Sequence, residues 1–146
     1  MEPIEGVVFI QGDFREAEVL QILEQTLSIG GVSRKVDVVI SDMAPNLSGI
    51  ESADAARISD LVELAVEFSV HHLTREGALV VKLFHGGAYD PMVKLFKEVF
   101  RTVKRFKPKA SRPGSSETFL VGLGLKLQSP GLQDSALTEK KGVNPL

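Results

Sequence analysis

A lysine inside an apolar run is the first residue of this sequence that could carry out chemistry. Lys82 lies in "VVKLF", where a buried charge is costly unless it has a partner or a task. Burial lowers the pKa of a lysine, and a lysine brought toward neutrality can accept a proton. Asp42, directly after "VDVVIS", could orient and balance that amine, and Glu117 could hold a second cation. Such a cluster suits the deprotonation of a hydroxyl group on a nucleic acid.

Each of these residues also has an ordinary structural explanation. Lys82 could be an edge lysine whose stem is buried and whose amine reaches solvent. Asp42 precedes Ala44-Pro45 and could simply begin a turn, and Asp13 after Gly12 has the same alternative. The residues alone leave these alternatives open. None of the three histidines has a ligand-like spacing, so we expect no metal site.

Alternating strand and helix patterns predict how the chain positions these groups. Apolar runs predict strands over 7–14, 36–41, 78–84, 103–108 and 118–125, and helical spacing predicts helices over 15–27, about 52–72 and 90–103. We expect Ser52 to cap the second helix and Asp90 the third. The continuous apolar run 36–41 is typical of a parallel strand buried on both faces.

This alternation predicts an α/β fold with a mostly parallel sheet and an antiparallel last strand. In open sheets of this kind, ligands bind at the carboxyl ends of the strands. We expect four polar side chains to converge there: Asp13, Asp42, Lys82 and Glu117.

The composition narrows the class of protein. The 146 residues fit one domain, which we expect over 1–127, with a disordered tail over 128–146. The absence of cysteine excludes disulfides and thiolate zinc sites and favours a reducing cytoplasm. No apolar run approaches the roughly 18 residues that a membrane helix needs.

Charge is unevenly distributed, although the net charge is only −2. Residues 1–93 carry a net charge of −9, whereas residues 94–112 carry +7. A basic segment on an acidic protein favours contact with a polyanion, and the alternative is a solvated helix face and loop. The candidate RNA-binding residues are Arg101, Lys104, Arg105, Lys107, Lys109 and Arg112.

Three segments together resemble the FtsJ/RrmJ family: "SDMAPNLSG", "GALVVKLFHG" and "KPKASRPGSSETFLVG". The resemblance runs from Met1 to about Lys126. It implies a Rossmann-like S-adenosylmethionine-dependent methyltransferase fold and 2′-O-methylation of a ribose, that of a uridine, in large-subunit (23S) ribosomal RNA. It also implies a cytoplasmic monomer that acts on the large ribosomal subunit.

The same resemblance implies roles for the polar residues. Lys82 matches the lysine that deprotonates the ribose 2′-hydroxyl, and Glu117 matches the acidic member of the family's lysine–aspartate–lysine–glutamate tetrad. Asp42 matches a catalytic residue that also lies near the reactive end of the cofactor. Asp13 matches the residue that recognises the adenine. Of the histidines, His85 could touch substrate, although a turn residue is the simpler interpretation.

Other family features are not found in this sequence. The glycine-rich cofactor loop, the acidic residue after the second strand and another tetrad lysine have no match, so the chain resembles a member that lacks the N-terminal part with the first two strands. We therefore expect weak or no cofactor binding and impaired activity. The alternative is a catalytically inactive RNA-binding remnant. A nicotinamide-dependent dehydrogenase is excluded because no G-x-G-x-x-G follows any strand.

Overall fold

The computed structural model describes residues 4–43, 48–84, 86–107 and 117–126. The chain divides into two compact units, Met1–Lys35 and Val36–Leu146. The expected tail over 128–146 lies outside the described residues, and the expected single domain over 1–127 stays a prediction.

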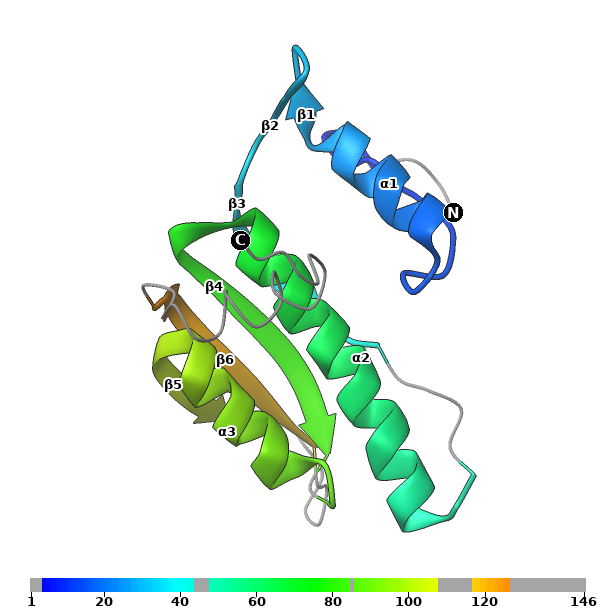
Figure 1. Ribbon diagram of the computed structural model, residues 1–146, viewed down its shortest axis with the longest axis vertical. Helices are drawn as coiled ribbons and strands as arrows, with labels where there is room; N and C mark the ends of the chain where they lie inside the picture. The colour runs from blue at the N-terminus through cyan, green and yellow to red at the C-terminus, as the bar shows by residue number, and fades with distance from the viewer. Residues whose placement is uncertain (1–3, 44–47, 85, 108–116, 127–146) are drawn as a thin grey trace, which may run out of the picture. The chain divides into compact units, whose positions relative to one another are not determined.

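The first unit is built around one helix and a short hairpin (Figure 1). Helix α1 spans Ala17–Thr26, which confirms the helix predicted over 15–27. Strands β1 (Ser28–Ile29) and β2 (Val32–Ser33) pair antiparallel. Gly30 and Gly31 join them with φ angles of 60° and 80°, which glycine adopts without steric cost and which favour tight hairpin turns.

The strand predicted over 7–14 is wrong. No strand forms over these residues. The side chains of Val7, Val8 and Phe9 are 54%, 70% and 61% exposed, so they do not pack in a core either. A strand needs a hydrogen-bonding partner, and within the described part of the chain this segment pairs with none. The apolar pattern is strand-like, but pattern alone does not supply the neighbouring backbone.

The second unit contains a four-stranded sheet in the order β3-β4-β6-β5 (Figure 1). Strand β3 pairs parallel with β4, and β6 pairs antiparallel with both β4 and β5. Three strands therefore run in one direction and the last runs opposite, as predicted. The strands span Val36–Ser41 (β3), Leu73–Phe84 (β4), Phe100–Phe106 (β5) and Glu117–Leu125 (β6).

Helices α2 (Glu51–His72) and α3 (Tyr89–Val99) pack on one face of this sheet (Figure 1). Along β4, Leu79, Val81 and Leu83 are buried beneath them, whereas the alternate residues are only partly covered. Phe96 of α3 and Phe100 of β5 complete this core, with ring centroids 5.4 Å apart. A Cβ at position 122 would overlap the Phe100 ring. The glycine at this position therefore allows β6 to pack closely against Phe100.

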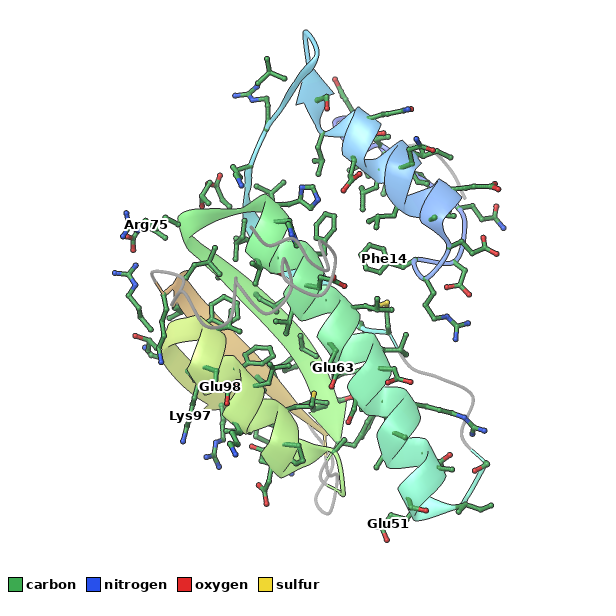
Figure 2. The ribbon with its side chains drawn as sticks, in the orientation of Figure 1. Phe14, Glu51, Glu63, Arg75, Lys97 and Glu98 are labelled. Carbon is green, nitrogen blue, oxygen red and sulfur yellow. The ribbon has the colours of Figure 1, made fainter. Side chains whose placement is uncertain are left out.

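Both helices begin without the caps that the sequence predicted. Ile50 is the N-cap residue of α2 and Ala88 that of α3, and neither contributes a side-chain hydrogen bond. Ser52 and Asp90 lie inside the first turns instead. On the outer surfaces of these helices, Glu63 of α2 and Lys97 of α3 are exposed (Figure 2).

The prediction that 36–41 is buried on both faces is also wrong. Strand β3 forms as expected, but Val38 and Ile40 are 53% and 73% exposed. In the described sheet β3 pairs only with β4, so the outer edge of β3 has no backbone hydrogen bonds to a neighbouring strand. An apolar edge strand of this kind is a template for pairing with other chains.

We expect Ile40→Lys to reduce self-association of the chain, because a charge on an edge strand opposes edge-to-edge pairing. Sedimentation velocity over a concentration series measures the effect. Ile22→Lys is the matched control, since Ile22 is also exposed but lies on α1. Equal association of wild type and Ile40→Lys would contradict this prediction.

Candidate active site

Three of the four predicted polar residues come together, because two carboxylates lie beside the amine of Lys82. The Lys82 Nζ lies 2.9 Å from Asp42 Oδ1 and 3.2 Å from Glu117 Oε2. The Lys82 and Glu117 side chains are 25% and 29% exposed, whereas that of Asp42 is 65% exposed. The amine is thus held by two carboxylates, and one of them faces solvent.

The register of the sheet explains this convergence. Ser41 pairs with Val81, so Asp42 follows β3 beside Lys82. On the other side of β4, Phe84 pairs with Glu117, which starts β6. Because β6 runs antiparallel, its first residue lies at the same edge as the carboxyl ends of β3 and β4. The predicted convergence at this edge is therefore confirmed for Asp42, Lys82 and Glu117, and their catalytic role stays a prediction.

The pKa of Lys82 moves in the direction opposite to the one predicted. Hydrogen bonds from the amine to Asp42 and then Glu117 raise its pKa above the ordinary 10.5, and they outweigh the lowering by burial. Glu117, expected to hold a second cation, holds this lysine instead. The ion pairs therefore stabilise the folded chain below pH 10.5, and their contribution is lost as pH rises through the higher pKa of the folded state.

We expect Asp42→Asn to lower the pKa of Lys82, because Asp42 is the larger cause of its elevation. The Cε and Nζ chemical shifts of Lys82, followed by NMR through alkaline pH, measure this change. Asp60→Asn, an exposed position on α2, controls for the lost charge. An unchanged Lys82 titration in Asp42→Asn would show that the observed ion pair is not maintained in solution.

Asp13 belongs to the first unit, where its surroundings fit a turn residue. Its Oδ1 accepts a hydrogen bond of 2.8 Å from the backbone N–H of Arg15, and its Oδ2 pairs with the Arg15 guanidinium at 2.7 Å. These contacts lower the pKa of Asp13 to about 2. The turn alternative accounts for this geometry, and adenine recognition by Asp13 stays a prediction.

Three of the candidate RNA-binding residues, Arg101, Lys104 and Arg105, lie on β5, and Lys107 directly follows it. Arg101 pairs with Glu76 at the start of β4, the opposite end of the sheet from Lys82. Lys104 and Lys107 are exposed, closer to the end of β6 where Glu117 lies. The Arg105 guanidinium lies over the Tyr89 ring, 5.7 Å from its centroid. Lys109 and Arg112 lie outside the described residues.

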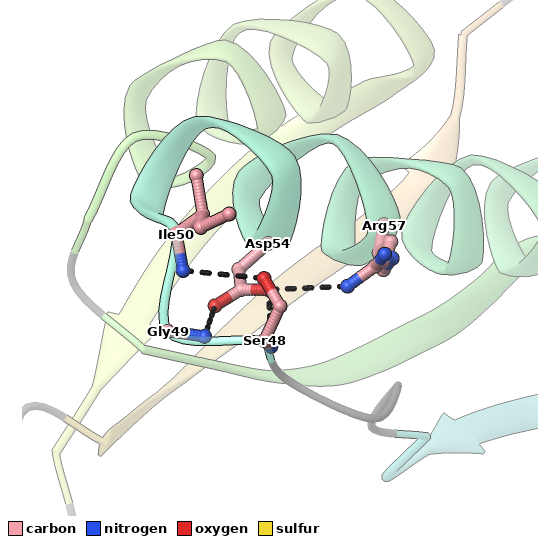
Figure 3. Close-up of polar contacts among 5 residues, drawn as sticks. All are labelled: Ser48, Gly49, Ile50, Asp54 and Arg57. Atoms are coloured by element: carbon pink, nitrogen blue, oxygen red, sulfur yellow. Dashed lines mark hydrogen bonds and ion pairs between the residues drawn. The ribbon is translucent and has the colours of Figure 1, made fainter.

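Two contacts near the site were not predicted. Tyr89 positions Arg105 through a cation–π contact, and the Asp54 carboxylate binds the segment before α2 (Figure 3). Neither contact follows a local spacing rule, since Tyr89 is far from Arg105 in sequence and Asp54 bonds to residues five and six positions earlier.

The residues that the structure describes contain no group of three or more His, Asp or Glu side chains that could hold a metal ion. None of their helices is long and apolar enough to span a membrane. The expectation of metal-free chemistry stays a prediction, as does a role for His85, which lies outside the described residues.

Comparison with known proteins gives consistent relatives. The chain is 72% identical over 130 residues to "Ribosomal RNA large subunit methyltransferase E" of Polaromonas naphthalenivorans, covering 89% of this chain and 53% of the relative. It is 70% identical over 128 residues to the protein of the same name from Variovorax paradoxus, covering 88% and 56%. The chain thus spans about half the length of the curated relatives it matches.

A solved structure and a family match agree with these relatives. The fold matches the crystal structure of a Plasmodium falciparum protein described as a ribosomal RNA methyltransferase, with a TM-score of 0.69 and 25% identity, over 86% of this chain and 67% of that one. The family described as FtsJ-like methyltransferase matches residues 1–125. The chain therefore belongs to the FtsJ-like methyltransferase family.

Proposed function

We propose that this chain carries the catalytic edge of an S-adenosylmethionine-dependent enzyme that methylates a ribose 2′-oxygen in large-subunit ribosomal RNA, at a uridine. The observation that carries the proposal is the Lys82 amine held between Asp42 and Glu117 at the carboxyl edge of the sheet. Membership of the family and the names of the relatives support the reaction class. We propose that the enzyme acts in the cytoplasm, as a monomer, on the large ribosomal subunit.

For this reaction, the protein mainly aligns the two reactants and supplies a general base. A ribose hydroxyl is a poor nucleophile until its proton is removed, and S-adenosylmethionine, when bound, supplies a methyl group already activated by its sulfonium. Lys82 Nζ takes the hydroxyl proton, and Glu117 and Asp42 hold the amine in place. Since these carboxylates also raise the pKa of Lys82, the unprotonated amine is the minor form at neutral pH.

The described residues fit the methyl donor only in part. Asp42 presents an exposed carboxylate beside Lys82, which suits a cationic donor. The glycines of "HGGA" follow β4, whereas the family's glycine-rich cofactor loop follows its first strand. Gly87 packs close to Ala55 of α2. We therefore do not expect these glycines to replace the cofactor loop. We expect Asp42 and Asp13 to contact the donor, and we expect this 146-residue chain to bind it weakly.

Isothermal titration of the 146-residue chain with S-adenosylmethionine tests that expectation. The expected result is no binding in the micromolar range, because this sequence has no match to the family's glycine-rich loop, whose glycines would let the backbone approach the donor closely. The matched measurement uses a chimaera, in which this chain is joined to the part of the Polaromonas naphthalenivorans relative that lies outside the matched region. Micromolar binding by the 146-residue chain itself would contradict the expectation.

Methyl transfer to ribosomal subunits tests the function. Large subunits from cells that lack this methylation are incubated with the chain or the chimaera and with deuterium-labelled S-adenosylmethionine. Mass spectrometry of the digested RNA then identifies the labelled nucleoside. Labelled 2′-O-methyluridine from the chimaera is the expected result. Label on a base, or on another ribose, would overturn the corresponding part of the proposal.

A second candidate function is RNA binding without catalysis. The exposed Lys104 and Lys107 favour it, because phosphate contacts alone would give such binding. The methyl-transfer assay with labelled S-adenosylmethionine distinguishes the two candidate functions. A chimaera that binds ribosomal RNA but transfers no label would favour the non-catalytic candidate.

A further inference from the structure

The segment that returns from β3 to α2 ends in a compact set of polar contacts (Figure 3). The Asp54 Oδ1 accepts hydrogen bonds from the Ser48 backbone N–H at 2.8 Å and from the Ser48 Oγ at 2.9 Å. Its Oδ2 accepts one from the Gly49 N–H at 2.9 Å. Ser48 Oγ in turn accepts from the Ile50 N–H at 3.2 Å. One carboxylate thus binds two consecutive backbone amides.

This carboxylate binds the residues before α2 and does not cap the first turn of the helix itself. The N-cap Ile50 has no side chain that could accept a hydrogen bond, whereas Asp54 reaches backward to the residues before the helix. Its side chain is only 14% exposed, and Arg57 pairs with it at 3.4 Å. The hydrogen bond from the Ser48 N–H is the largest cause of the lowered pKa of Asp54. Asp54 is therefore a charged anchor for the segment and not a solvated surface acid.

The same turn of α2 also contacts the segment that follows β4. A Cβ placed on Gly87 would lie 3.2 Å from the Ala55 Cβ, which is tighter than ordinary van der Waals contact. Gly87 lies between Lys82 and α3, and Ala55 directly follows Asp54. The two chain segments that leave the strand ends carrying Asp42 and Lys82 therefore meet at one helical turn.

We propose that Asp54 is a positioning residue: by holding Ser48 and Gly49, two of the described residues before α2, it limits how far the chain can move after Asp42 and so helps to keep the Asp42 carboxylate beside the Lys82 amine. The contact of Ala55 with Gly87 fixes the same turn against the segment that follows Lys82. This assignment goes beyond the residues of the catalytic cluster, and its catalytic meaning rests on the proposed function.

Asp54→Asn in the 146-residue chain tests the anchor directly. The amide NH₂ group has a donor where the carboxylate accepts, so at least one of the two backbone hydrogen bonds is lost. We expect hydrogen exchange of the Ser48 and Gly49 amides, measured by NMR, to accelerate about tenfold or more, the cost of one lost charge-assisted hydrogen bond. Asp60→Asn, with the same charge change on an exposed part of α2, should leave both rates unchanged.

The titration of Lys82 tests positioning apart from local stability. If Asp54 keeps Asp42 in place, Asp54→Asn should also lower the pKa of Lys82 toward 10.5, as is expected for Asp42→Asn. A purely structural anchor would change the exchange rates without moving that titration. Unchanged exchange, or faster exchange with an unchanged Lys82 pKa, overturns the proposal.

A steric pair supplies the rescue experiment. Gly87→Ala should push against Ala55 and accelerate exchange of the Ser48 and Gly49 amides. Adding Ala55→Gly should restore slow exchange, although glycine lowers helix stability by about 1 kcal/mol relative to alanine. Faster exchange in the double variant than in Gly87→Ala would mean that general weakening of α2 governs the segment, which overturns the role of this contact.

These readouts need no methyl transfer, so they judge the anchor separately from the enzyme. In the chimaera, Asp54→Asn should lower kcat on the order of 10²-fold, as misplacement of a catalytic group does. Absence of methyl transfer in the unmodified chimaera would count against the proposed function and would leave the exchange and titration results decisive for Asp54.

Discussion

Lys82→Ala is expected to lower the rate of methyl transfer by about 10²- to 10⁴-fold, the usual contribution of a positioned general base. The reason is geometric as well as chemical, because the Lys82 amine is the group that Asp42 and Glu117 hold at the site edge. Binding of S-adenosylmethionine to the chimaera should stay nearly unchanged. Single-turnover kinetics with the chimaera and large ribosomal subunits measures the rate.

Lys82→Arg separates a base from a fixed positive charge. Arginine keeps the charge that pairs with Asp42 and Glu117, but it does not lose a proton in proteins. If Lys82 is the base, the arginine variant should be as impaired as the alanine variant. A rate close to that of the unmodified enzyme would instead show that Lys82 contributes only charge.

The pH dependence follows from the same ion pairs. Because the pKa of Lys82 is raised above 10.5, the unprotonated fraction of the amine grows tenfold with each pH unit below that value. The rate of a base-limited step should rise with pH in the same way across the neutral range. A rate that does not change with pH, with chemistry shown to be limiting, would contradict the role of base.

Charge reversal at Lys104, Arg105 and Lys107 is the second large expected effect. Replacing all three with glutamate should weaken RNA binding on the order of 10²-fold or more at low salt. It should also flatten the salt dependence, because each lost phosphate contact removes about 0.7 to 0.9 from the slope of log K against log salt. Fluorescence anisotropy with a labelled ribosomal RNA fragment measures both quantities.

Lys94 and Lys97 provide a matched control for this experiment. Both are exposed on α3, and Lys97 lies on the outer surface of that helix (Figure 2). Reversing their charges changes the net charge of the basic segment without touching β5. If the control variant weakens RNA binding as much as the β5 variant, binding depends on overall charge, and the solvated-surface alternative for β5 holds.

Local sequence patterns were enough to predict the helices and strands that carry the candidate site. The helices over α1, α2 and α3 and the strands β3, β4 and β6 were predicted because each has its own apolar period or run. The run that became β5 begins earlier than expected, because Val99 and Phe100 fit either a helix end or a strand start. The strand predicted over 7–14 failed because strand formation needs a partner that a pattern does not provide.

The convergence of Asp42, Lys82 and Glu117 was likewise predicted from strand direction alone. Each residue lies at a strand end, and an antiparallel last strand places its first residue beside the ends of the others. The direction of the Lys82 pKa shift was wrong, because it depends on how far burial and two nearby carboxylates offset each other. That balance is set by distances, which no sequence pattern contains.

The sequence by itself thus determined the order of helices and strands in the second unit, the edge of its sheet where polar residues gather, and the resemblance that the family match confirmed. These properties are local or follow from chain direction. Only the tertiary structure decided that Ile40 is exposed, that Lys82 holds its proton more firmly, and that Asp54 binds the backbone amides of Ser48 and Gly49. Each of these depends on atoms that are distant in sequence and are brought together, or left apart, by packing.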